Sequence, residues 1–276
     1  MFKDTLFLTS QKILPQAFLS RLAGKLANCE NNFVKNRLIE LAIHRFKINL
    51  NEALIENPKA YTSFNDFFIR KLKPEARVID QSIDSIISPA DGRIMQSGKI
   101  TDGKLIQAKG KNFSLQALTA NTQTEEYTDF VVIYLSPSDY HRVHMPLDGK
   151  LSRMTYIPGK LFSVNKVTAE NIEGLFAKNE RLVCYFNTAI GEVAVIFVGA
   201  MLAAGIETVW HKLVAPNYYK KVTHFNYKEY SSYFKKGDEI GLFNFGSTVI
   251  TLFPNHKTAL HEALTDIKMG EIIATI

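Results

Sequence analysis

A short segment near the end of the chain, Gly246-Ser247-Thr248, lies between two apolar runs, residues 240–245 and 249–253. Glycine permits backbone conformations closed to other residues, and the hydroxyl of the serine that follows it can reach back to the glycine carbonyl. An attack there would cut the chain. The alternative for a lone Gly-Ser-Thr is a strand bulge or a turn, and this segment alone does not separate the two interpretations.

Two other segments contain residue types that can assist a serine. Residues 140–146, Tyr-His-Arg-Val-His-Met-Pro, hold His141 and His144 three residues apart, and residues 88–92, Ser-Pro-Ala-Asp-Gly, hold the carboxylate of Asp91. Serine, histidine and aspartate act as nucleophile, general base and orienting group in whatever order the chain supplies them. Because most proteins of this size contain all three somewhere, their presence does not establish a triad.

Together these segments resemble the phosphatidylserine decarboxylases, self-processing pyruvoyl enzymes of phospholipid synthesis, over nearly the whole chain. Within them, the block Tyr140 to Pro146 is the most specific. Phe245 stands where bacterial members usually carry leucine, which alters packing beside the cut but no reacting atom. Five blocks carry the resemblance: Phe64-Asn65-Asp66-Phe67-Phe68-Ile69-Arg70 with Leu72 and Arg77, Pro89-Ala90-Asp91-Gly92, Tyr140 to Pro146, Phe162-Ser163-Val164-Asn165 with Asn179-Glu180-Arg181, and Gly246-Ser247-Thr248.

The resemblance implies a self-cleavage in which His144 takes the proton of the Ser247 hydroxyl. Asp91 is expected to hold the imidazole in the useful tautomer and to stabilise its positive form. The serine oxygen then attacks Gly246, the peptide becomes an ester, and elimination leaves a dehydroalanine that hydrolyses to a pyruvoyl group. The products are a large chain, residues 1–246, and a small chain, residues 247–276, which form a heterodimer.

The same resemblance implies the cofactor and the second reaction. The pyruvoyl group derived from Ser247 forms a Schiff base with phosphatidylserine and does the work of pyridoxal phosphate, so neither pyridoxal phosphate nor a metal is expected. His141 is the expected donor of a proton to the carbanion, with His144 as the alternative. The residues expected to line the lipid pocket are Phe162, Ser163 and Asn165.

Other interpretations of these residues stay open. The two histidines are spaced as zinc ligands are, but no third ligand lies near them in the sequence. Thr248 either donates a hydrogen bond at the cut or merely favours a strand. Arg70 and Arg77 either contact phosphate or form solvated ion pairs.

Two further classes of function compete with the decarboxylase. A serine hydrolase would use the same three residues on an external ester or peptide, although the chain lacks a Gly-x-Ser-x-Gly elbow. A non-catalytic membrane-binding protein is consistent with the amphipathic N-terminal residues and the net charge of +6. Self-cleavage separates the three, because only the pyruvoyl enzyme would release a small fragment.

The pattern after Pro74 predicts the elements that position the reactive residues. Short apolar runs separated by Gly, Asp, Asn and Pro are typical of antiparallel strands. The fold class is therefore expected to be α+β, with N-terminal amphipathic helices followed by a mostly antiparallel, β-rich catalytic core. We expect residues 51–276 to form this catalytic domain.

The N-terminal residues show a helical, amphipathic pattern. Apolar residues recur at three- and four-residue steps among Lys12, Arg21 and Lys25: Ile13, Leu14, Phe18, Leu19, Leu22 and Leu26. Such a stripe fits a helix packed on the core as well as one that faces lipid. The family resemblance favours lipid, so residues 1–50 are expected to form an amphipathic membrane-association region. A further helix is expected between Tyr61 and Leu72, with Ser63 as its N-cap.

Composition sets outer limits on these interpretations. The chain has 276 residues, 46% of them hydrophobic, enough for one sizeable core, and its two cysteines are too few for a disulfide framework. The longest uncharged apolar run, Val193 to Ile206, is shorter than the roughly 18 residues of a membrane span, and no secretory signal is visible. With the resemblance, these features predict a peripheral enzyme on the cytoplasmic side of the inner membrane. It is expected to bind phosphatidylserine in an anionic membrane, to form a homo-oligomer and to bind no nucleic acid.

Overall fold

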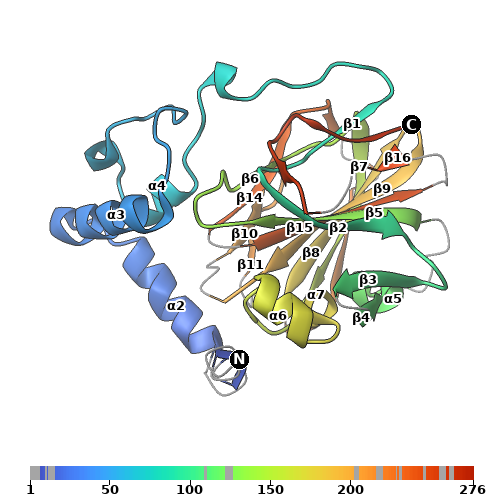
Figure 1. Ribbon diagram of the computed structural model, residues 1–276, viewed down its shortest axis with the longest axis horizontal. Helices are drawn as coiled ribbons and strands as arrows, with labels where there is room; N and C mark the ends of the chain where they lie inside the picture. Colours follow the sequence, from blue (N-terminus) through green and yellow to red (C-terminus); the bar gives the residue numbers. More distant parts are fainter. Residues whose placement is uncertain are drawn as a thin grey trace.

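The computed structural model describes residues 7–9, 11, 16–108, 111–121, 127–201, 205–215, 220–227, 229, 232–244, 247–254, 259–260 and 264–276. Phe245 and Gly246, the residues before the predicted cut, lie outside the described residues. The described elements confirm an α+β fold in which N-terminal helices precede a β-rich core (Figure 1).

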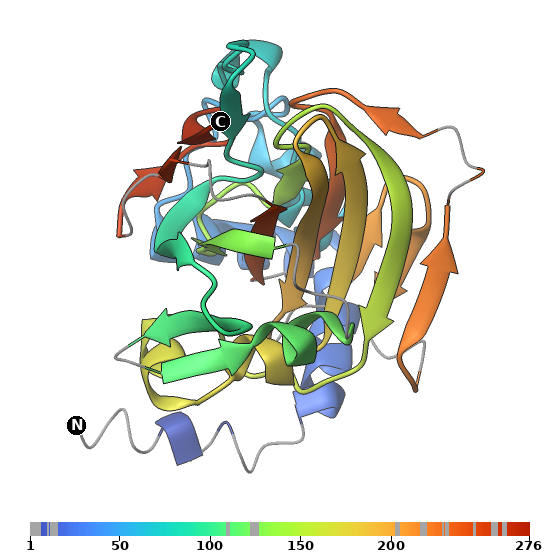
Figure 2. The same ribbon diagram turned by 90° about the vertical axis from the view of Figure 1, so that its right-hand side faces the viewer.

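A nine-stranded antiparallel sheet forms the centre of the core. Figure 2 shows strands β7, β8 and β9 of this sheet curving side by side. The strands that neighbour one another in order are β12 (Thr223–Asn226), β7 (Gly149–Ile157), β8 (Arg181–Thr188), β9 (Gly191–Gly199), β15 (Ser247–Pro254), β5 (Tyr127–Leu135), β2 (Gly92–Lys99) and β17 (Asp266–Ile267), with β13 (Tyr233–Phe234) beside β7.

Three smaller antiparallel sheets surround the central one. They are β11 (Lys212–Ala215), β10 (Ile206–Thr208), β14 (Glu239–Phe243) and β6 (Arg142–His144); β1 (Ser85–Ile87), β18 (Ile272–Thr275) and β16 (Ala259–Leu260); and β3 (Lys104–Ala108) with β4 (Lys111–Ser114). Short helices α5 (Leu115–Thr119), α6 (Lys166–Asn171) and α7 (Leu175–Lys178) complete the core.

Strand β15 is buried at every position because other elements cover both faces of the sheet. Side chains alternate between the two faces of a strand. Val249 and Phe253 therefore join the core cluster that contains Val143 of β6, whereas Ile250 and Leu252 join a second cluster with α7 and β4. The same alternation places Ser247 on the face of Val249, toward the sheet that contains β6.

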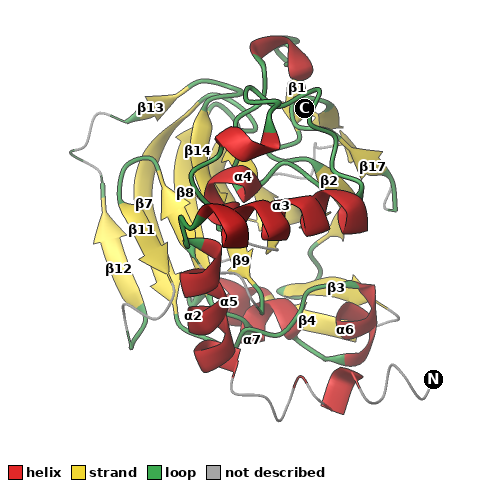
Figure 3. Ribbon diagram, turned by 90° about the vertical axis from the view of Figure 1, so that its left-hand side faces the viewer, coloured by secondary structure: helices red, strands yellow, loops and turns green. Residues whose placement is uncertain are grey.

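The N-terminal helices lie together at one side of the β core, as Figure 3 shows. Helix α2 (Gln16–Ala27) leads to α3 (Asn32–Phe46). Asn31 is the N-cap of α3, and its side chain accepts hydrogen bonds from the amides of Phe33 and Val34. Ala27, Ile39 and Ala42 share a third core cluster with residues 48–68, so this helical unit extends beyond residue 50.

Helix α4 (Phe64–Phe68) is shorter than the helix expected between Tyr61 and Leu72. The expected N-cap is confirmed, because Ser63 accepts a hydrogen bond of 3.1 Å from the amide of Asp66. Residues 71–73 pair with residues 52–54 instead of continuing the helix, through bonds such as that from the amide of Leu54 to the carbonyl of Lys71. Single-turn helices η1 (Pro58–Ala60) and η2 (Pro74–Ala76) flank this segment.

Gly92→Ala should destabilise the fold, because a Cβ at Gly92 would lie 2.3 Å from the carbonyl oxygen of Tyr134. Overpacking of this kind costs about 1–3 kcal/mol, so urea unfolding should show a free energy of unfolding lower by that amount. Gly98→Ala on the same strand is the matched control, since its Cβ would meet only Phe130, at 3.9 Å. Equal stability of the two variants would contradict the packing argument.

Candidate active site

Ser247 occupies the first position of β15, in the middle of the central sheet. It is paired with Leu135 of β5 on one side and with Gly199 of β9 on the other. Its side chain is fully buried, and its Oγ has no hydrogen-bond partner among the described residues. A buried hydroxyl without an acceptor is costly, and a catalytic role is one of the explanations for such a group in a native structure.

His141 lies immediately before β6 and is fully buried. Its Nδ1 is 2.8 Å from the carbonyl oxygen of Asp139, and because a carbonyl only accepts, Nδ1 carries the proton. Nε2 therefore has the lone pair, and it has no partner in the described part of the chain. The ring packs on Phe68 of α4, with centroids 4.1 Å apart.

His144 ends β6 and has both ring nitrogens in use. Its Nδ1 donates to the carbonyl of Gly237 at 2.8 Å, so Nε2 holds the lone pair and accepts from the hydroxyl of Tyr140 at 3.1 Å. The amide of His144 donates to the carbonyl of Pro89, which brings the Asp91 segment against β6.

Burial sets the charge state of both histidines. It lowers the pKa of His141 to about 3, and it lowers the pKa of His144 below its ordinary value of 6.5. The negative charge of Asp91 opposes both shifts and does not overcome them. Both imidazoles are therefore neutral near pH 7, with a lone pair on Nε2, which is the form that a general base requires.

Asp91 is buried and serves as the anion of a compact ion pair. Its carboxylate accepts from Arg77 through both oxygens, with Nε to Oδ1 at 2.8 Å, and from the amide of Met269 at 2.9 Å. Lys268 lies 3.6 Å away. Among the described residues, His144 donates no hydrogen bond to Asp91, because its Nδ1 donates to the carbonyl of Gly237. The expectation that Asp91 holds the tautomer is thus corrected, since the Gly237 carbonyl fixes it. Stabilisation of the positive imidazole by Asp91 stays a prediction.

The two arginines singled out in the sequence are both buried and are not solvated ion pairs. Arg77 joins Asp91 to Glu52, whose Oε2 lies 2.8 Å from Nη2. Arg70 is only 5% exposed and binds the carbonyls of Ser138 and Asp139. The solvated alternative is wrong because both side chains are shielded from water, with only 7% of the Arg77 side chain exposed.

A polar chain that the sequence did not indicate holds Asn244, the last described residue before the predicted cut. The side chain of Asn65 in α4 donates to Oδ1 of Asn244 at 3.1 Å, and Nδ2 of Asn244 donates to Glu207 at 2.7 Å. The amide of Asn244 donates to the carbonyl of Gly205. Asn65 belongs to the 64–70 block of the resemblance, which was its only signal.

The loop with the predicted lipid-pocket residues is tied to the strand beside Ser247. Asn179 donates to the carbonyls of both Phe162 and Gly199 at 2.8 Å, and Gly199 is the pairing partner of Ser247. Asn165 caps α6, with its side chain accepting from the amide of Thr168. The backbone amide of Ser163 donates to Oε1 of Gln11 at 2.9 Å. The binding of lipid by Phe162, Ser163 and Asn165 stays a prediction.

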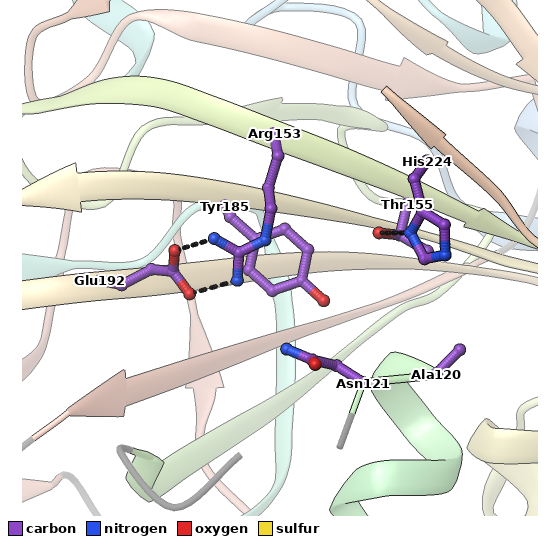
Figure 4. A pocket seen from close by; sticks show the side chains of 7 residues that line it. All are labelled: Ala120, Asn121, Arg153, Thr155, Tyr185, Glu192 and His224. Carbon is purple, nitrogen blue, oxygen red and sulfur yellow. Dashed lines mark hydrogen bonds and ion pairs between the residues drawn. The ribbon is translucent and has the colours of Figure 1, made fainter. Parts of the chain in front are cut away.

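Two pockets differ in their relation to this site. One, of about 440 Å³, borders it, because its lining includes Lys268 beside Asp91 and Asp139, whose carbonyl binds His141. The other, of about 300 Å³, lies on the opposite face of the sheet (Figure 4). Its charged and polar groups satisfy one another, with Arg153 forked on Glu192 and Thr155 bonded to His224.

The described residues contain no group of three or more His, Cys, Asp or Glu side chains placed to hold a metal ion. Ser247, His141, His144 and Asp91 are all buried. Asp91 lies near enough to both histidines for its charge to act on them, and Ser247 lies on the face of the central sheet that packs toward β6. The catalytic roles of all four remain predictions.

Comparison with known proteins places the chain in a family. A family model described as phosphatidylserine decarboxylase matches residues 64–275, and a second, described as PSD, matches residues 6–47. The chain is 56% identical over 278 residues to the phosphatidylserine decarboxylase proenzyme of Francisella philomiragia subsp. philomiragia, with 99% of each chain covered. It is 59% identical over 252 residues to the proenzyme of the same name from Francisella tularensis subsp. novicida, covering 91% of this chain and 89% of the relative. The chain therefore belongs to the phosphatidylserine decarboxylase family and is a carboxy-lyase that converts phosphatidylserine to phosphatidylethanolamine.

Proposed function

We propose that the chain is a proenzyme that cuts itself between Gly246 and Ser247 and decarboxylates phosphatidylserine with a pyruvoyl group made from Ser247. One observation carries this proposal: the Ser247 hydroxyl is buried at the start of a central strand, has no partner among the described residues, and lies on the sheet face that packs toward β6, where the neutral imidazole of His144 lies. The proenzyme names of the relatives support it. Mass spectrometry of the small chain tests it, since a ketone must replace the amino terminus.

In the first stage, His144 is the proposed base. Its Nε2 accepts a hydrogen bond from the Tyr140 hydroxyl. For the reaction, this hydrogen bond must be replaced by one from the hydroxyl of Ser247. The imidazolium that forms is favoured by the negative charges of Glu239 and Asp91, and Arg77 and the Met269 amide hold Asp91 in place.

The covalent steps then balance without an external reagent other than water. Ser247 Oγ bonds to the carbonyl carbon of Gly246, and the C–N bond of the peptide breaks as the nitrogen takes a proton, which converts the peptide to an ester. Loss of the Ser247 α-proton expels the Gly246 carboxylate and leaves dehydroalanine. Its imine tautomer takes up water and releases ammonia, which leaves the pyruvoyl group on the small chain.

In the second stage, the pyruvoyl group supplies a ketone that condenses with the substrate amine and accepts the electrons released with carbon dioxide. The buried environment around Ser247 excludes water from this step. His141 is the proposed proton donor. It is neutral in the uncut chain, and the nearby anionic substrate would favour its protonated form.

The small chain is expected to remain with the large one after the cut. Residues 247–254 form β15, which hydrogen-bonds to β5 on one side and β9 on the other, and both neighbours belong to the large chain. To leave, the small chain would have to break the hydrogen bonds of a buried strand to both of its neighbours, which costs far more free energy than the single cut peptide bond contributes to holding the strand in place. We propose that this heterodimer further assembles into a homo-oligomer, as family resemblance suggests.

The lipid substrate is proposed to be reached from a membrane surface through α2 and α3. Phe18, Leu22 and Leu26 form a stripe at four-residue steps on α2 and are each about half exposed, with Phe33 and Leu41 exposed on α3. An apolar stripe among basic residues is typical of a helix that lies in a lipid interface. None of the described helices is long and apolar enough to cross a bilayer. We propose peripheral attachment to the cytoplasmic side of the inner membrane.

Three variants separate the proposed roles. Ser247→Ala and His144→Ala should both leave one uncut chain, because nucleophile and base are lost. His141→Ala should still release the fragment of 276 − 246 = 30 residues and decarboxylate poorly. Intact mass and turnover of phosphatidylserine measure the two stages. Normal turnover by the His141 variant would remove it as donor, and a cut His144 variant would remove it as base.

Self-cleavage should be insensitive to pH around 6.5, the ordinary pKa of histidine. Because burial lowers the pKa of His144, its base form persists as the pH falls through 6.5, and the rate should decline only in more acidic solution. The rate of cleavage is measured at several pH values between 5 and 8, by quenching freshly translated chain at successive times and recording its intact mass. A midpoint near 6.5 would mean that the base is solvated and not this histidine.

Replacing both Phe18 and Leu22 by serine should weaken binding to anionic vesicles without stopping self-cleavage. Each apolar side chain inserted in the interface contributes roughly 1–2 kcal/mol, so binding should fall about tenfold or more in a flotation assay. Val78 and Ile83, which are even more exposed but lie outside the helices, provide the control pair when replaced by serine. Equal loss in both pairs, or no loss in the first, would place the lipid contact elsewhere.

A further inference from the structure

Arg70, two residues after α4, is a buried cation without a counter-anion. Its guanidinium packs over the ring of Phe67. Nη2 donates to the carbonyls of Ser138 and Asp139, at 2.9 and 3.4 Å. Its other two nitrogens, Nε and Nη1, have no hydrogen-bond partner among the described residues. No carboxylate of the described residues lies within ion-pair distance of it.

The other buried arginines show what a purely structural guanidinium does in this fold. Arg181 also lacks a carboxylate, but all three of its nitrogens donate to backbone carbonyls, those of Leu118, Asn179 and Ala117. Arg77 is neutralised by two carboxylates. Arg70 alone of these three keeps two donors unused. A buried charge with unused donors is strongly unfavourable unless another group satisfies it.

The place of this cation connects it with the reaction. The carbonyl of Asp139 accepts from both Arg70 and Nδ1 of His141, so the two side chains lie side by side on one acceptor. Phe68, two residues before Arg70, covers the His141 ring. The charge of Arg70 adds to burial in lowering the pKa of His141, as expected for neighbours.

We infer that Arg70 is the receptor for the phosphate of the substrate headgroup, which accepts a hydrogen bond from a free Nε or Nη1 donor. This inference rests on the proposed function. Guanidinium suits phosphate because it stays charged and its N–H groups form charge-assisted hydrogen bonds with phosphate oxygens. In phosphatidylserine only the β-carbon and one ester oxygen separate the phosphorus from the α-carbon, so a phosphate on Arg70 places the reacting carbon near His141.

The substrate carboxylate is a less suitable ligand for Arg70, because binding it would raise the activation barrier of decarboxylation. Decarboxylation converts the carboxylate into neutral carbon dioxide, so a guanidinium fixed on it would stabilise the reactant more than the transition state. The phosphate keeps its charge throughout the reaction. Binding it stabilises reactant and transition state alike, and the loss of this contact should therefore raise KM and leave kcat nearly unchanged.

Arg70→Gln tests the assignment, with Arg70→Lys as the charge-conserving variant and Arg93→Gln as a control. Arg93 is a half-exposed cation that lines the pocket beside the site, and its replacement makes the same change in net charge. Intact mass reports self-cleavage, and kcat and KM are measured on phosphatidylserine in mixed micelles. Glycerophosphoethanolamine, which has the phosphate and lacks the carboxylate, and free serine, which has the carboxylate and lacks the phosphate, serve as competitive inhibitors.

For Arg70→Gln we expect normal cleavage, a KM raised about tenfold or more with kcat within about threefold, and loss of inhibition by glycerophosphoethanolamine only. Arg70→Lys should have a KM between those of Arg70→Gln and the unmodified protein. Arg93→Gln should have the kcat and KM of the unmodified protein. An unchanged KM, a fall in kcat at constant KM, or loss of inhibition by serine alone would overturn the assignment.

A measurement on the unmodified mature protein keeps the test decisive if Arg70→Gln does not fold or mature. Phenylglyoxal modifies arginine, and its reaction at Arg70 is followed by peptide mass spectrometry. Glycerophosphoethanolamine should slow this reaction relative to sodium chloride of equal ionic strength and leave Arg93 unaffected; equal rates at Arg70 would overturn the inference. The proposed function is judged separately, by the mass of the small chain and by turnover of the unmodified protein.

Discussion

The pairing of β15 between β5 and β9 is the constraint on which the rest of the structure depends. It places Ser247 in the middle of a buried sheet, opposite Leu135 and Gly199, so the hydroxyl is held still and out of water. The same pairing makes the cut tolerable. The residues after it are held by hydrogen bonds along two edges and by side chains in two core clusters, and these contacts do not require the peptide bond that is lost.

Burial of this strand also decides the charge states around it. Two histidines are kept neutral because water is excluded from them, and each is fixed in one tautomer by a backbone carbonyl, that of Asp139 or Gly237. The carboxylate of Asp91 lies in the same environment and is paired there with Arg77 and the Met269 amide. The chemistry is thus prepared by desolvation, with the Asp91 charge available for the imidazolium that forms later.

The N-terminal helical unit contributes to the site as well as to the surface. Three side chains of residues 64–70 reach the catalytic core: Asn65 binds Asn244 before the cut, Phe68 covers His141, and Arg70 binds the turn before His141. The helices that expose apolar side chains pack on this same segment through one shared cluster. The surface proposed to meet lipid and the wall of the site are therefore parts of a single packed unit.

The amino-acid sequence by itself determined the fold class and the N-cap at Ser63, and through the blocks of resemblance it predicted roles for Asp91, His141, His144 and Ser247. These follow from local pattern and residue type, which the linear chain displays. It did not determine that Gly237 rather than Asp91 orients His144, that Arg70 is buried without an anion, or that Asn65 reaches Asn244, 179 positions away. Such partners are chosen by strand order and by the docking of the helical unit, since hydrogen bonds and desolvation depend on distances between segments that have no fixed separation along the chain.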